Sequence, residues 1–177
     1  MDTLNIFEAN ILLWIQENIR TDILDIVMAF ISNINNAGML AIAAIIILIV
    51  VKRYRAVGFT AMISLISEFV VVNVFTKNIV ARTRPYIVND ALETLGKLPT
   101  DYSFPSGHTG SAFAVATVMF LCMPAKYGIP SMAVAVIMGI SRLYNGVHYP
   151  TDVIGGAVIG LVTGFFVFKY IYKAKDF

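Results

Sequence analysis

Long apolar segments, separated by short polar ones, make up most of the chain. Six of them contain at most one charged residue each: 23–34, 37–51, 56–76, 106–125, 129–147 and 153–172. A helix needs about 20 mostly apolar residues to cross the hydrocarbon layer of a bilayer. The first segment is clearly shorter, and the others approach or reach that length. We therefore predict an all-α fold, a polytopic membrane bundle of about six helices, forming one membrane-embedded domain over residues 1–177.

Residues 1–20 follow a different pattern. Apolar residues recur at helical spacing with polar ones between them: Leu4, Phe7, Ile11, Leu12 and Ile15 against Glu8, Gln16, Glu17 and Arg20. This pattern predicts an amphipathic helix that lies in the membrane interface. A secretory signal peptide is not expected, because Asp2 and Glu8 stand where such a peptide carries positive charge.

Composition excludes several other classes of protein. The chain of 177 residues is 58% hydrophobic and 14% charged, whereas soluble domains are about 45–50% apolar and about 25% charged. The single cysteine, Cys122, has no partner for an internal disulfide, and one cysteine with two histidines makes a poor zinc site. A net charge of +2 is too small for a nucleic-acid-binding surface. We expect an integral membrane protein without metal, cofactor or nucleic-acid partner, and the oligomeric state stays open.

The lysines and arginines predict an orientation in the cell membrane. Lys and Arg are enriched in short cytoplasmic loops. If the last five segments alternate, seven basic residues fall on one side: Lys52, Arg53, Arg55, Lys126, Lys169, Lys173 and Lys175. We assign that side to the cytoplasm. The other side receives the Asn35–Asn36 turn, the 76–106 loop and the 142–152 turn. Four residues there violate the rule and become functional candidates: Arg82, Arg84, Lys97 and Arg142.

One spacing pattern points to helix packing. Gly156, Gly160 and Gly164 are four residues apart, and Gly155 precedes them. Small residues at this spacing let helices approach each other closely in lipid. We assign these glycines no chemistry.

Three polar clusters lie at the outer ends of predicted segments and can meet at one membrane depth. In the first, Lys77 and Arg84 are seven residues apart, which places them on one helical face about 10 Å apart. Pro85 disfavours helical geometry at Arg84. We expect the helix to end near Thr83, so that Arg84 folds back toward Lys77. Two such cations suit a phosphate group.

The second cluster is Ser106-Gly107-His108, at the start of a predicted helix. Ser106 suits the N-cap position, and the free N–H groups of a first helical turn bind anions. Gly107 would let the anion approach the backbone. His108 would then lie beside the bound group, where an imidazolium can donate a proton to a leaving oxygen.

The third cluster runs from Ser141 to Asp152. Residues 144–146 break the preceding helix, and Pro150 suits the first turn of the next. The Asp152 carboxylate can accept the N–H of His148 and fix its tautomer, which leaves the other ring nitrogen as a nucleophile. Arg142 supplies a third cation.

Each element alone has a commoner structural explanation, such as a lipid-anchoring arginine, a hydrogen-bonded histidine or a serine cap. Their coincidence favours function, because both histidines of the chain and three cations meet at three helix ends. The clusters read K-x6-R-P, P-S-G-H and S-R-x5-H-x3-D. In this the chain resembles the type 2 phosphatidic acid phosphatase (PAP2) superfamily, over about residues 55–170.

The resemblance implies a metal-independent phosphatase with a helical core. It implies that His148 attacks phosphorus and becomes a phosphohistidine, that Asp152 orients it, and that His108 protonates the leaving group and then activates water. The phosphoryl oxygens would be held by Lys77, Arg84, Ser106, the Gly107 amide and Arg142. Small membrane-embedded members act on undecaprenyl pyrophosphate, phosphatidylglycerol phosphate or phosphatidate. Soluble vanadate haloperoxidases share the site, but the apolar segments argue against that branch.

The leading hypothesis is an outward-facing lipid phosphatase acting on undecaprenyl pyrophosphate, with phosphatidylglycerol phosphate or phosphatidate as alternatives. The loop 86–104, which carries Asp90, Glu93, Lys97 and Asp101, is expected to set headgroup choice. A non-catalytic transporter or binder of anionic lipids is the competing class, with Glu68 as a proton relay; we favour a helix contact for Glu68. The pairing of His148 with Asp152 favours catalysis, because a binder needs no oriented nucleophile. A purely structural membrane protein would need neither the second nor the third cluster.

Overall fold

The computed structural model describes residues 3–96 and 98–173, so Asp2, Lys97 and Lys175 lie outside the described residues. Nine α-helices are found in this part: α1 Thr3–Asn18, α2 Asp22–Ile34, α3 Met39–Val50, α4 Arg55–Phe69, α5 Lys77–Val80, α6 Pro85–Val88, α7 Gly107–Cys122, α8 Ala125–Tyr144 and α9 Pro150–Val167. π-Helical turns join α4 to α5 over Val70–Thr76 and extend α9 over Phe168–Tyr172. Short 3-10 turns cover Asn36–Gly38 and Lys52–Tyr54. No strand occurs among the described residues, which confirms the predicted all-α fold.

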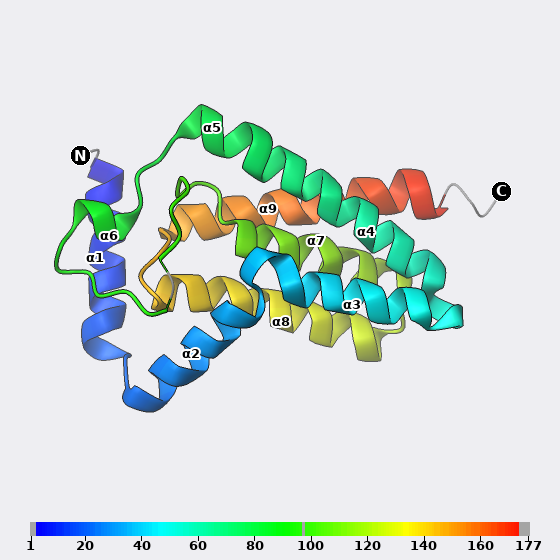
Figure 1. Ribbon diagram of the computed structural model, residues 1–177, viewed down its shortest axis with the longest axis horizontal. Coiled ribbons are helices and arrows are strands. Elements are labelled where there is room, and N and C mark those ends of the chain that lie inside the picture. The colour runs from blue at the N-terminus through cyan, green and yellow to red at the C-terminus, as the bar shows by residue number, and fades with distance from the viewer. Residues whose placement is uncertain (1–2, 97, 174–177) are drawn as a thin grey trace.

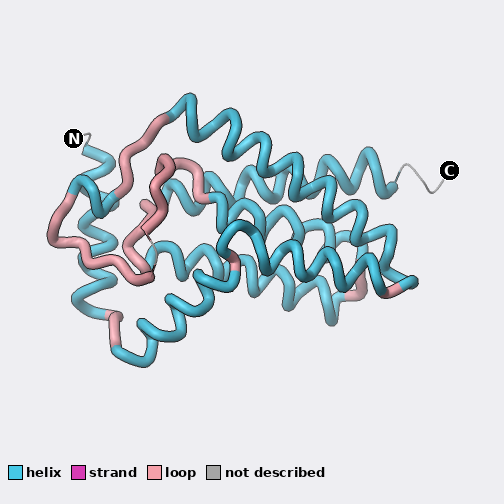
Figure 2. Tube along the Cα trace, viewed as in Figure 1, coloured by secondary structure: helices cyan, strands magenta, loops and turns pink. Residues whose placement is uncertain are grey.

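The long axis of the molecule is followed by helices α3, α4, α7, α8 and α9, whereas α1 lies across one end (Figure 1). Helix α7 is central and contacts α4, α8 and α9. The long loop between α6 and α7 folds over the same end as α1 (Figure 2). Every chain segment that carries a predicted site residue therefore meets at that end.

Three helical segments are long and apolar enough to cross a membrane: Lys52–Val88, Ala125–Tyr144 and Pro150–Tyr172. Helices α2 and α3, bent by 57° at the 3-10 turn, together make a fourth candidate. Helix α7 is apolar but has only 16 residues, about 24 Å at 1.5 Å per residue, which is less than the hydrocarbon thickness of about 30 Å. The chain is a multi-pass membrane protein in which α7 is a shorter apolar helix.

The helix that carries Lys77 ends earlier than predicted. It stops at Val80 rather than near Thr83, because Ala81 adopts the left-handed conformation with a φ of 48°. Alanine favours helix, so the sequence gives no sign of this break. Arg84 is extended, with a ψ of 152°, as the following proline predicts. Pro85 then occupies the first turn of α6.

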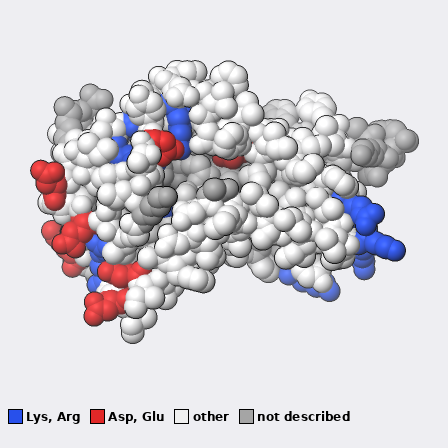
Figure 3. Space-filling view, in the orientation of Figure 1, with Lys and Arg blue, Asp and Glu red and all other residues white. Residues whose placement is uncertain are grey.

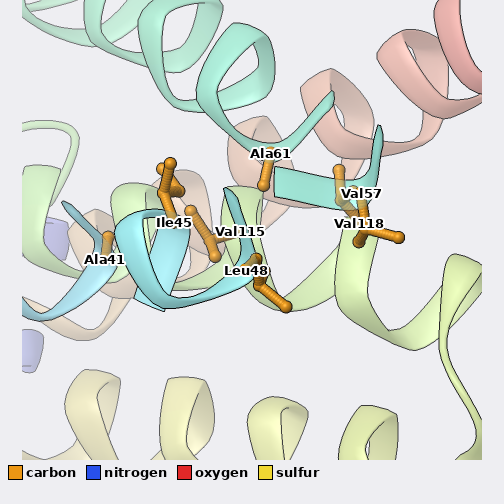
Figure 4. Packing of buried hydrophobic residues seen from close by; sticks show 7 residues of the cluster. All are labelled: Ala41, Ile45, Leu48, Val57, Ala61, Val115 and Val118. Atoms are coloured by element: carbon orange, nitrogen blue, oxygen red, sulfur yellow. The ribbon is translucent and has the colours of Figure 1, made fainter. Parts of the chain in front are cut away.

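Small and medium apolar side chains fill the interior between α3, α4 and α7. The buried cluster consists of Ala41, Ile45, Leu48, Val57, Ala61, Val115 and Val118 (Figure 4). Larger apolar side chains such as Ile47 and Phe69 point outward and are more than half exposed. This distribution suits a lipid environment, where close packing rather than burial of large apolar groups holds helices together.

The glycines of α9 allow α7 to pack directly against its backbone, as predicted. A Cβ atom on Gly156 would lie 2.4 Å from the carbonyl oxygen of Ser106, and one on Gly160 would lie 2.5 Å from that of Gly110. The same approach brings the backbone N–H of Ser106 to 2.9 Å from the carbonyl oxygen of Asp152. Close packing of these two helices therefore joins the second polar cluster to the third.

Helix α1 buries residues from both of its faces against the protein. Glu8 of the polar set and Leu12 of the apolar set are both 2% exposed, whereas Leu4 and Phe7 are 54% and 63% exposed. An acidic side chain is therefore buried at Glu8. The physical reason is an ion pair with Arg82 from a distant loop, which residue spacing within the helix does not reveal.

Candidate active site

A cavity of about 440 Å³ contains residues from all three polar clusters. Its lining includes Lys77, Arg84, Gly107, His108, Arg142 and His148, together with Asp101 from the α6–α7 loop. Two predicted site residues, Ser106 and Asp152, lie behind this wall and are fully buried. The structure therefore brings six of the eight predicted residues to one cavity and places the other two immediately behind it.

Three buried cations face the cavity. Lys77, Arg84 and Arg142 are 6%, 2% and 4% exposed. Arg142 is held in the last turn of α8, where its Nη1 donates a hydrogen bond to Ser32 Oγ of α2. Its Nε has no hydrogen-bond partner among the described residues. Buried guanidinium and ammonium groups of this kind make strong hydrogen bonds to phosphoryl oxygens.

Asp101 is the carboxylate that meets two of these cations. Arg84 Nη2 donates to Asp101 Oδ1 at 2.6 Å, and Lys77 Nζ forms an ion pair with Asp101 Oδ2. Burial alone would raise the pKa of the Asp101 carboxyl, but the hydrogen bonds and charges of Lys77 and Arg84 outweigh burial and lower the pKa to about 2. Asp101 lies in the loop that is expected to set headgroup choice, but its pairing with Lys77 and Arg84 carries no sequence signal.

His148 lies in the turn between α8 and α9 and is 2% exposed. Its Nδ1 is 3.4 Å from Asp152 Oδ2, and its Nε2 is 3.3 Å from Arg84 Nη1. A guanidinium has donors only, so Nε2 must act as the acceptor. We infer that the proton of the neutral ring is on Nδ1, toward Asp152. The Nε2 lone pair then faces the buried cations.

The surroundings of His148 keep its ring neutral. Burial is the main cause of a pKa lowered to about 4, and the nearby cations Arg84 and Arg142 lower it further. Asp152 acts in the opposite direction but does not restore the ordinary value. An imidazole with such a pKa carries a free lone pair at neutral pH, which a nucleophile requires.

The Asp152 carboxylate is fixed by donors on both oxygens. Oδ2 accepts the backbone N–H of Tyr149 at 2.9 Å and the hydroxyl of Ser103. Oδ1 accepts Arg82 Nη1 at 2.6 Å. Arg82 is a candidate from the sequence because of its position on the outer side, whereas Ser103 carries no sequence signal.

His108 is the second residue of α7 and is held by the turn between α2 and α3. Its Nε2 is 3.2 Å from Asn36 Oδ1, and its carbonyl oxygen accepts a hydrogen bond from Asn35 Nδ2 at 3.1 Å. The Asn35–Asn36 turn thus lies at the same end as the site, where the alternation of segments places it. The contact between Asn36 and His108 was not foreseen, because the two residues are far apart in the sequence.

Ser106 and Gly107 have different roles at the start of α7: Ser106 caps the helix, and Gly107 lines the cavity. Ser106 Oγ accepts from the backbone N–H and the hydroxyl of Thr109, at 3.5 and 3.0 Å. It is therefore the expected N-cap, and its side chain turns toward its own helix rather than the cavity. Gly107 faces the cavity, where a Cβ atom would lie 3.8 Å from Lys77 Nζ. The open approach to the backbone is thus at Gly107.

Glu68 lies on the cavity wall, where α4 meets α7. It is 1% exposed, and a Cβ atom on Gly110 would lie 2.1 Å from its Oε1. Glu68 thus fills the space left by a glycine of α7, which agrees with the predicted helix contact.

No group of three or more His, Cys, Asp or Glu side chains comes together as a metal site within residues 3–96 and 98–173. The cavity instead offers three cations, one neutral imidazole backed by a carboxylate, and a second imidazole at a helix start. This combination suits nucleophilic attack on a phosphoryl group whose charge is met by protein side chains.

Known proteins share both the sequence pattern and the fold. An undecaprenyl-diphosphatase of Sulfolobus acidocaldarius is 37% identical over 64% of this chain, which spans 55% of that relative's length. The crystal structure of Aquifex aeolicus LpxE matches with a TM-score of 0.79 and 26% identity, over 96% of this chain and 97% of that one. A transmembrane PAP2-type phosphatidylglycerolphosphate phosphatase from Bacillus subtilis matches with a TM-score of 0.75 and 25% identity, over 96% of this chain and 85% of that one. Because residues 55–176, more than half of the chain, also match the PAP2 superfamily as a whole, the chain belongs to that superfamily.

Proposed function

We propose that the protein is a membrane phosphatase that hydrolyses lipid phosphate or diphosphate esters through a phosphohistidine on His148. The observation that carries the proposal is the arrangement around one imidazole. Its Nδ1 faces the Asp152 carboxylate and its Nε2 faces Arg84 in a cavity that also holds Lys77 and Arg142.

In the first step, the Nε2 lone pair of His148 attacks phosphorus and the bond from phosphorus to the leaving oxygen breaks. The leaving oxygen takes a proton from the protonated ring of His108. Lys77, Arg84 and Arg142 hold the phosphoryl oxygens, where the transition state gathers negative charge. The phosphorylated ring of His148 is positively charged while Nδ1 keeps its proton, and the Asp152 carboxylate stabilises that charge.

In the second step, neutral His108 takes a proton from a water molecule whose oxygen attacks phosphorus. The bond between phosphorus and Nε2 breaks, its electron pair returns to His148, and inorganic phosphate leaves. His108 ends protonated, ready for the next leaving group. Asn36 helps to place the His108 ring in both steps.

Undecaprenyl diphosphate is the substrate we favour, because it is the substrate named for the Sulfolobus relative, which is 37% identical to this chain over 114 aligned residues. Phosphatidylglycerol phosphate is the alternative, supported by the match to the Bacillus enzyme over 96% of the chain. Both substrates present a phosphoryl group on a membrane-embedded lipid. The fixed His148–Asp152 pair favours either over a transporter or binding protein.

We further propose that the site faces away from the cytoplasm and that residues 1–20 lie in the membrane interface on that side. Basic side chains gather at the end opposite α1, whereas acidic side chains gather around α1 and α2 (Figure 3). The basic end contains the α3–α4 turn with Lys52 and Arg53, both exposed, and such clusters favour the cytoplasm. Helix α1 lies across the end of the bundle that holds the site (Figure 1).

The proposal is tested by phosphate release from a panel of lipids in detergent with EDTA present. The panel contains undecaprenyl diphosphate, phosphatidylglycerol phosphate and phosphatidate, with His148→Ala as the matched inactive control. We expect turnover that survives EDTA, is inhibited by orthovanadate and is highest on the diphosphate. Absence of phosphate release from every lipid, or release that is equal in His148→Ala, would refute the proposed function.

The proposed side is tested by cysteine labelling of intact cells, or of spheroplasts where an outer membrane is present. A cysteine replaces Asp90 in the α6–α7 loop or Arg55 at the basic end, in a Cys122→Ser background. We expect an impermeant maleimide to label the cysteine at position 90 and not that at position 55. Labelling only at position 55 would invert the assignment.

A further inference from the structure

A buried ion cluster lies behind His148, and two of its three members, Glu8 and Arg82, have no role in the steps above. Its members are Glu8 of α1, Arg82 in the segment between α5 and α6, and Asp152 of α9. The side chains of Glu8 and Asp152 are 3% and 0% exposed, and that of Arg82 is 12% exposed. Charges this well buried are costly unless every one of them is paired.

The guanidinium of Arg82 joins the two carboxylates. Nη1 donates to Asp152 Oδ1 at 2.6 Å and to Thr151 Oγ1 at 2.8 Å. Nη2 donates to Glu8 Oε2 at 2.5 Å, and Nε donates to Asn5 Oδ1 at 3.1 Å. All three nitrogens are therefore used, which fixes the plane of the group.

Aromatic and helix-terminal contacts hold the cluster from two further sides. The Cζ atom of Arg82 lies 3.9 Å from the centre of the Tyr149 ring, a stacking arrangement that arginine favours. Glu8 Oε1 accepts the backbone N–H of Thr151 at 2.7 Å. That N–H is in the first turn of α9, where it has no partner within the helix. Glu8 thus places α1 against the same helix start that carries Asp152.

We propose that Arg82, held by Glu8 of α1, is a positioning residue that fixes the Asp152 carboxylate against His148. Arg82 touches neither the cavity nor the reacting atoms. It occupies Oδ1 of Asp152, so that the imidazole faces Oδ2, which also accepts from Tyr149 and Ser103. Docking of α1 is therefore part of building the nucleophile, and the inference rests on the proposed function of His148.

The charges explain why the cation is needed. Glu8 and Asp152 both accept hydrogen bonds from the start of α9, and Arg82 is the cation that pairs with both carboxylates. Two carboxylates that share a buried site favour uptake of a proton by one of them. A protonated Asp152 could no longer balance the positive charge that His148 gains when its bond to phosphorus forms.

The kinetic test compares Arg82→Gln with Arg20→Gln. Arg20 is a matched control, because it also joins the N-terminal region to the α6–α7 loop. Its Nη1 donates a hydrogen bond to the carbonyl oxygen of Glu93 at 3.1 Å, and its guanidinium lies over the ring of Tyr144. We expect Arg82→Gln to lower kcat by about 10- to 100-fold with an unchanged inhibition constant for orthovanadate. Arg20→Gln should stay within about threefold of the unmodified protein, and Arg82→Lys, which keeps the charge, should recover part of the loss.

Coupling to Asp152 provides a second measurement. If Arg82 acts through that carboxylate, Arg82→Gln should cause little further loss in an Asp152→Asn background. An undiminished loss there overturns the proposal, as does a loss equal to that of Arg20→Gln. A parallel loss of orthovanadate binding overturns it too, because phosphate binding belongs to the other cations.

A third measurement does not depend on activity and so separates this inference from the proposed function. The chain has two histidines, so His108→Asn leaves His148 as the single imidazole for ¹⁵N NMR in detergent. We expect the Nδ1–H tautomer in that background and a mixture of tautomers once Arg82→Gln or Glu8→Gln is added. An unchanged tautomer in both variants overturns the inference, whatever the lipid assays show.

Discussion

Arg84 Nη2 donates a hydrogen bond to Asp101 Oδ1 at 2.6 Å, so a carboxylate of the α6–α7 loop binds the same arginine that contacts His148, the proposed nucleophile. Lys77 pairs with the other oxygen of the same carboxylate. A phosphoryl group that enters the cavity must displace this carboxylate or share the two cations with it. The loop that folds over the site thus carries an internal competitor for the substrate.

Removing the competing charge should tighten anion binding. We expect Asp101→Asn to lower the inhibition constant of orthovanadate by about threefold to tenfold, a modest effect because the side chain is half exposed. Because the pKa of Asp101 is lowered to about 2, its carboxylate stays charged at every working pH above that value. The gain should therefore persist from about pH 5 to pH 8.

The control for this variant is Asp90→Asn, which removes an exposed carboxylate elsewhere in the same loop. Inhibition by orthovanadate should be unchanged in Asp90→Asn. This result would show that the tighter binding in Asp101→Asn comes from that carboxylate and not from a general loss of negative charge at this end of the protein. Weaker inhibition in Asp101→Asn would show instead that Asp101 helps to hold the two cations in place for phosphate.

His148 should titrate well below an ordinary histidine. Its pKa is lowered from 6.5 to about 4, mainly by burial. Between those values the unfolded chain binds a proton that the folded protein does not, so stability should fall as the pH is lowered from about 6.5 to about 4. NMR titration of the His108→Asn variant, in which His148 is the only imidazole, should give a midpoint near 4. A midpoint near 6.5 would contradict the buried, cation-flanked environment.

The two histidines should respond differently to the leaving group. An alkoxide from a lipid monophosphate is a poor leaving group and needs a proton, whereas p-nitrophenolate leaves without one. In a rapid quench of the first turnover, His108→Ala should therefore lose far more phosphohistidine formation on the lipid than on p-nitrophenyl phosphate. His148→Ala should lose both by several orders of magnitude, because attack is required for either.

An equal defect of His108→Ala on the two substrates would remove the acid role. His108 would then be a residue that binds the phosphoryl group. The first turnover must be isolated for this comparison, because the proposed second step also uses His108, as the base that activates water.

Gly156 should tolerate no side chain. The Cβ of an alanine there would lie 2.4 Å from the carbonyl oxygen of Ser106, which belongs to the backbone and cannot turn away. We expect Gly156→Ala to separate α9 from α7, with a lower melting temperature in detergent and a loss of turnover. Val158→Ala, on the exposed face of the same helix, serves as the control and should change the melting temperature little. Equal melting temperatures for the two variants would show that separating α9 from α7 at Gly156 does not lower the stability of the protein.

Local chemistry was sufficient to predict much of the fold. The lengths of the apolar segments determine an all-helical membrane protein, because an unpaired backbone cannot cross lipid. Turn and cap positions followed from residue type: Gly146 adopts a φ of 69°, Pro150 begins α9, and Ser106 caps α7. The helix break at Ala81 was not predicted. Its left-handed conformation is imposed by tertiary contacts and does not reflect an intrinsic preference of alanine.

The sequence by itself determined which residues are candidates for the chemistry, because the spacing of Lys77, Arg84, His108, His148 and Asp152 relative to helix ends can be read from the chain. Only the tertiary structure decided how they are supported. Asp101 on Arg84, Asn36 on His108, and Glu8 with Arg82 behind Asp152 are contacts between residues distant in sequence. Such pairs leave no periodic or local signal, because they depend on how whole helices pack. The buried position of Glu8 follows from that packing, and the spacing of residues within its own helix does not reveal it.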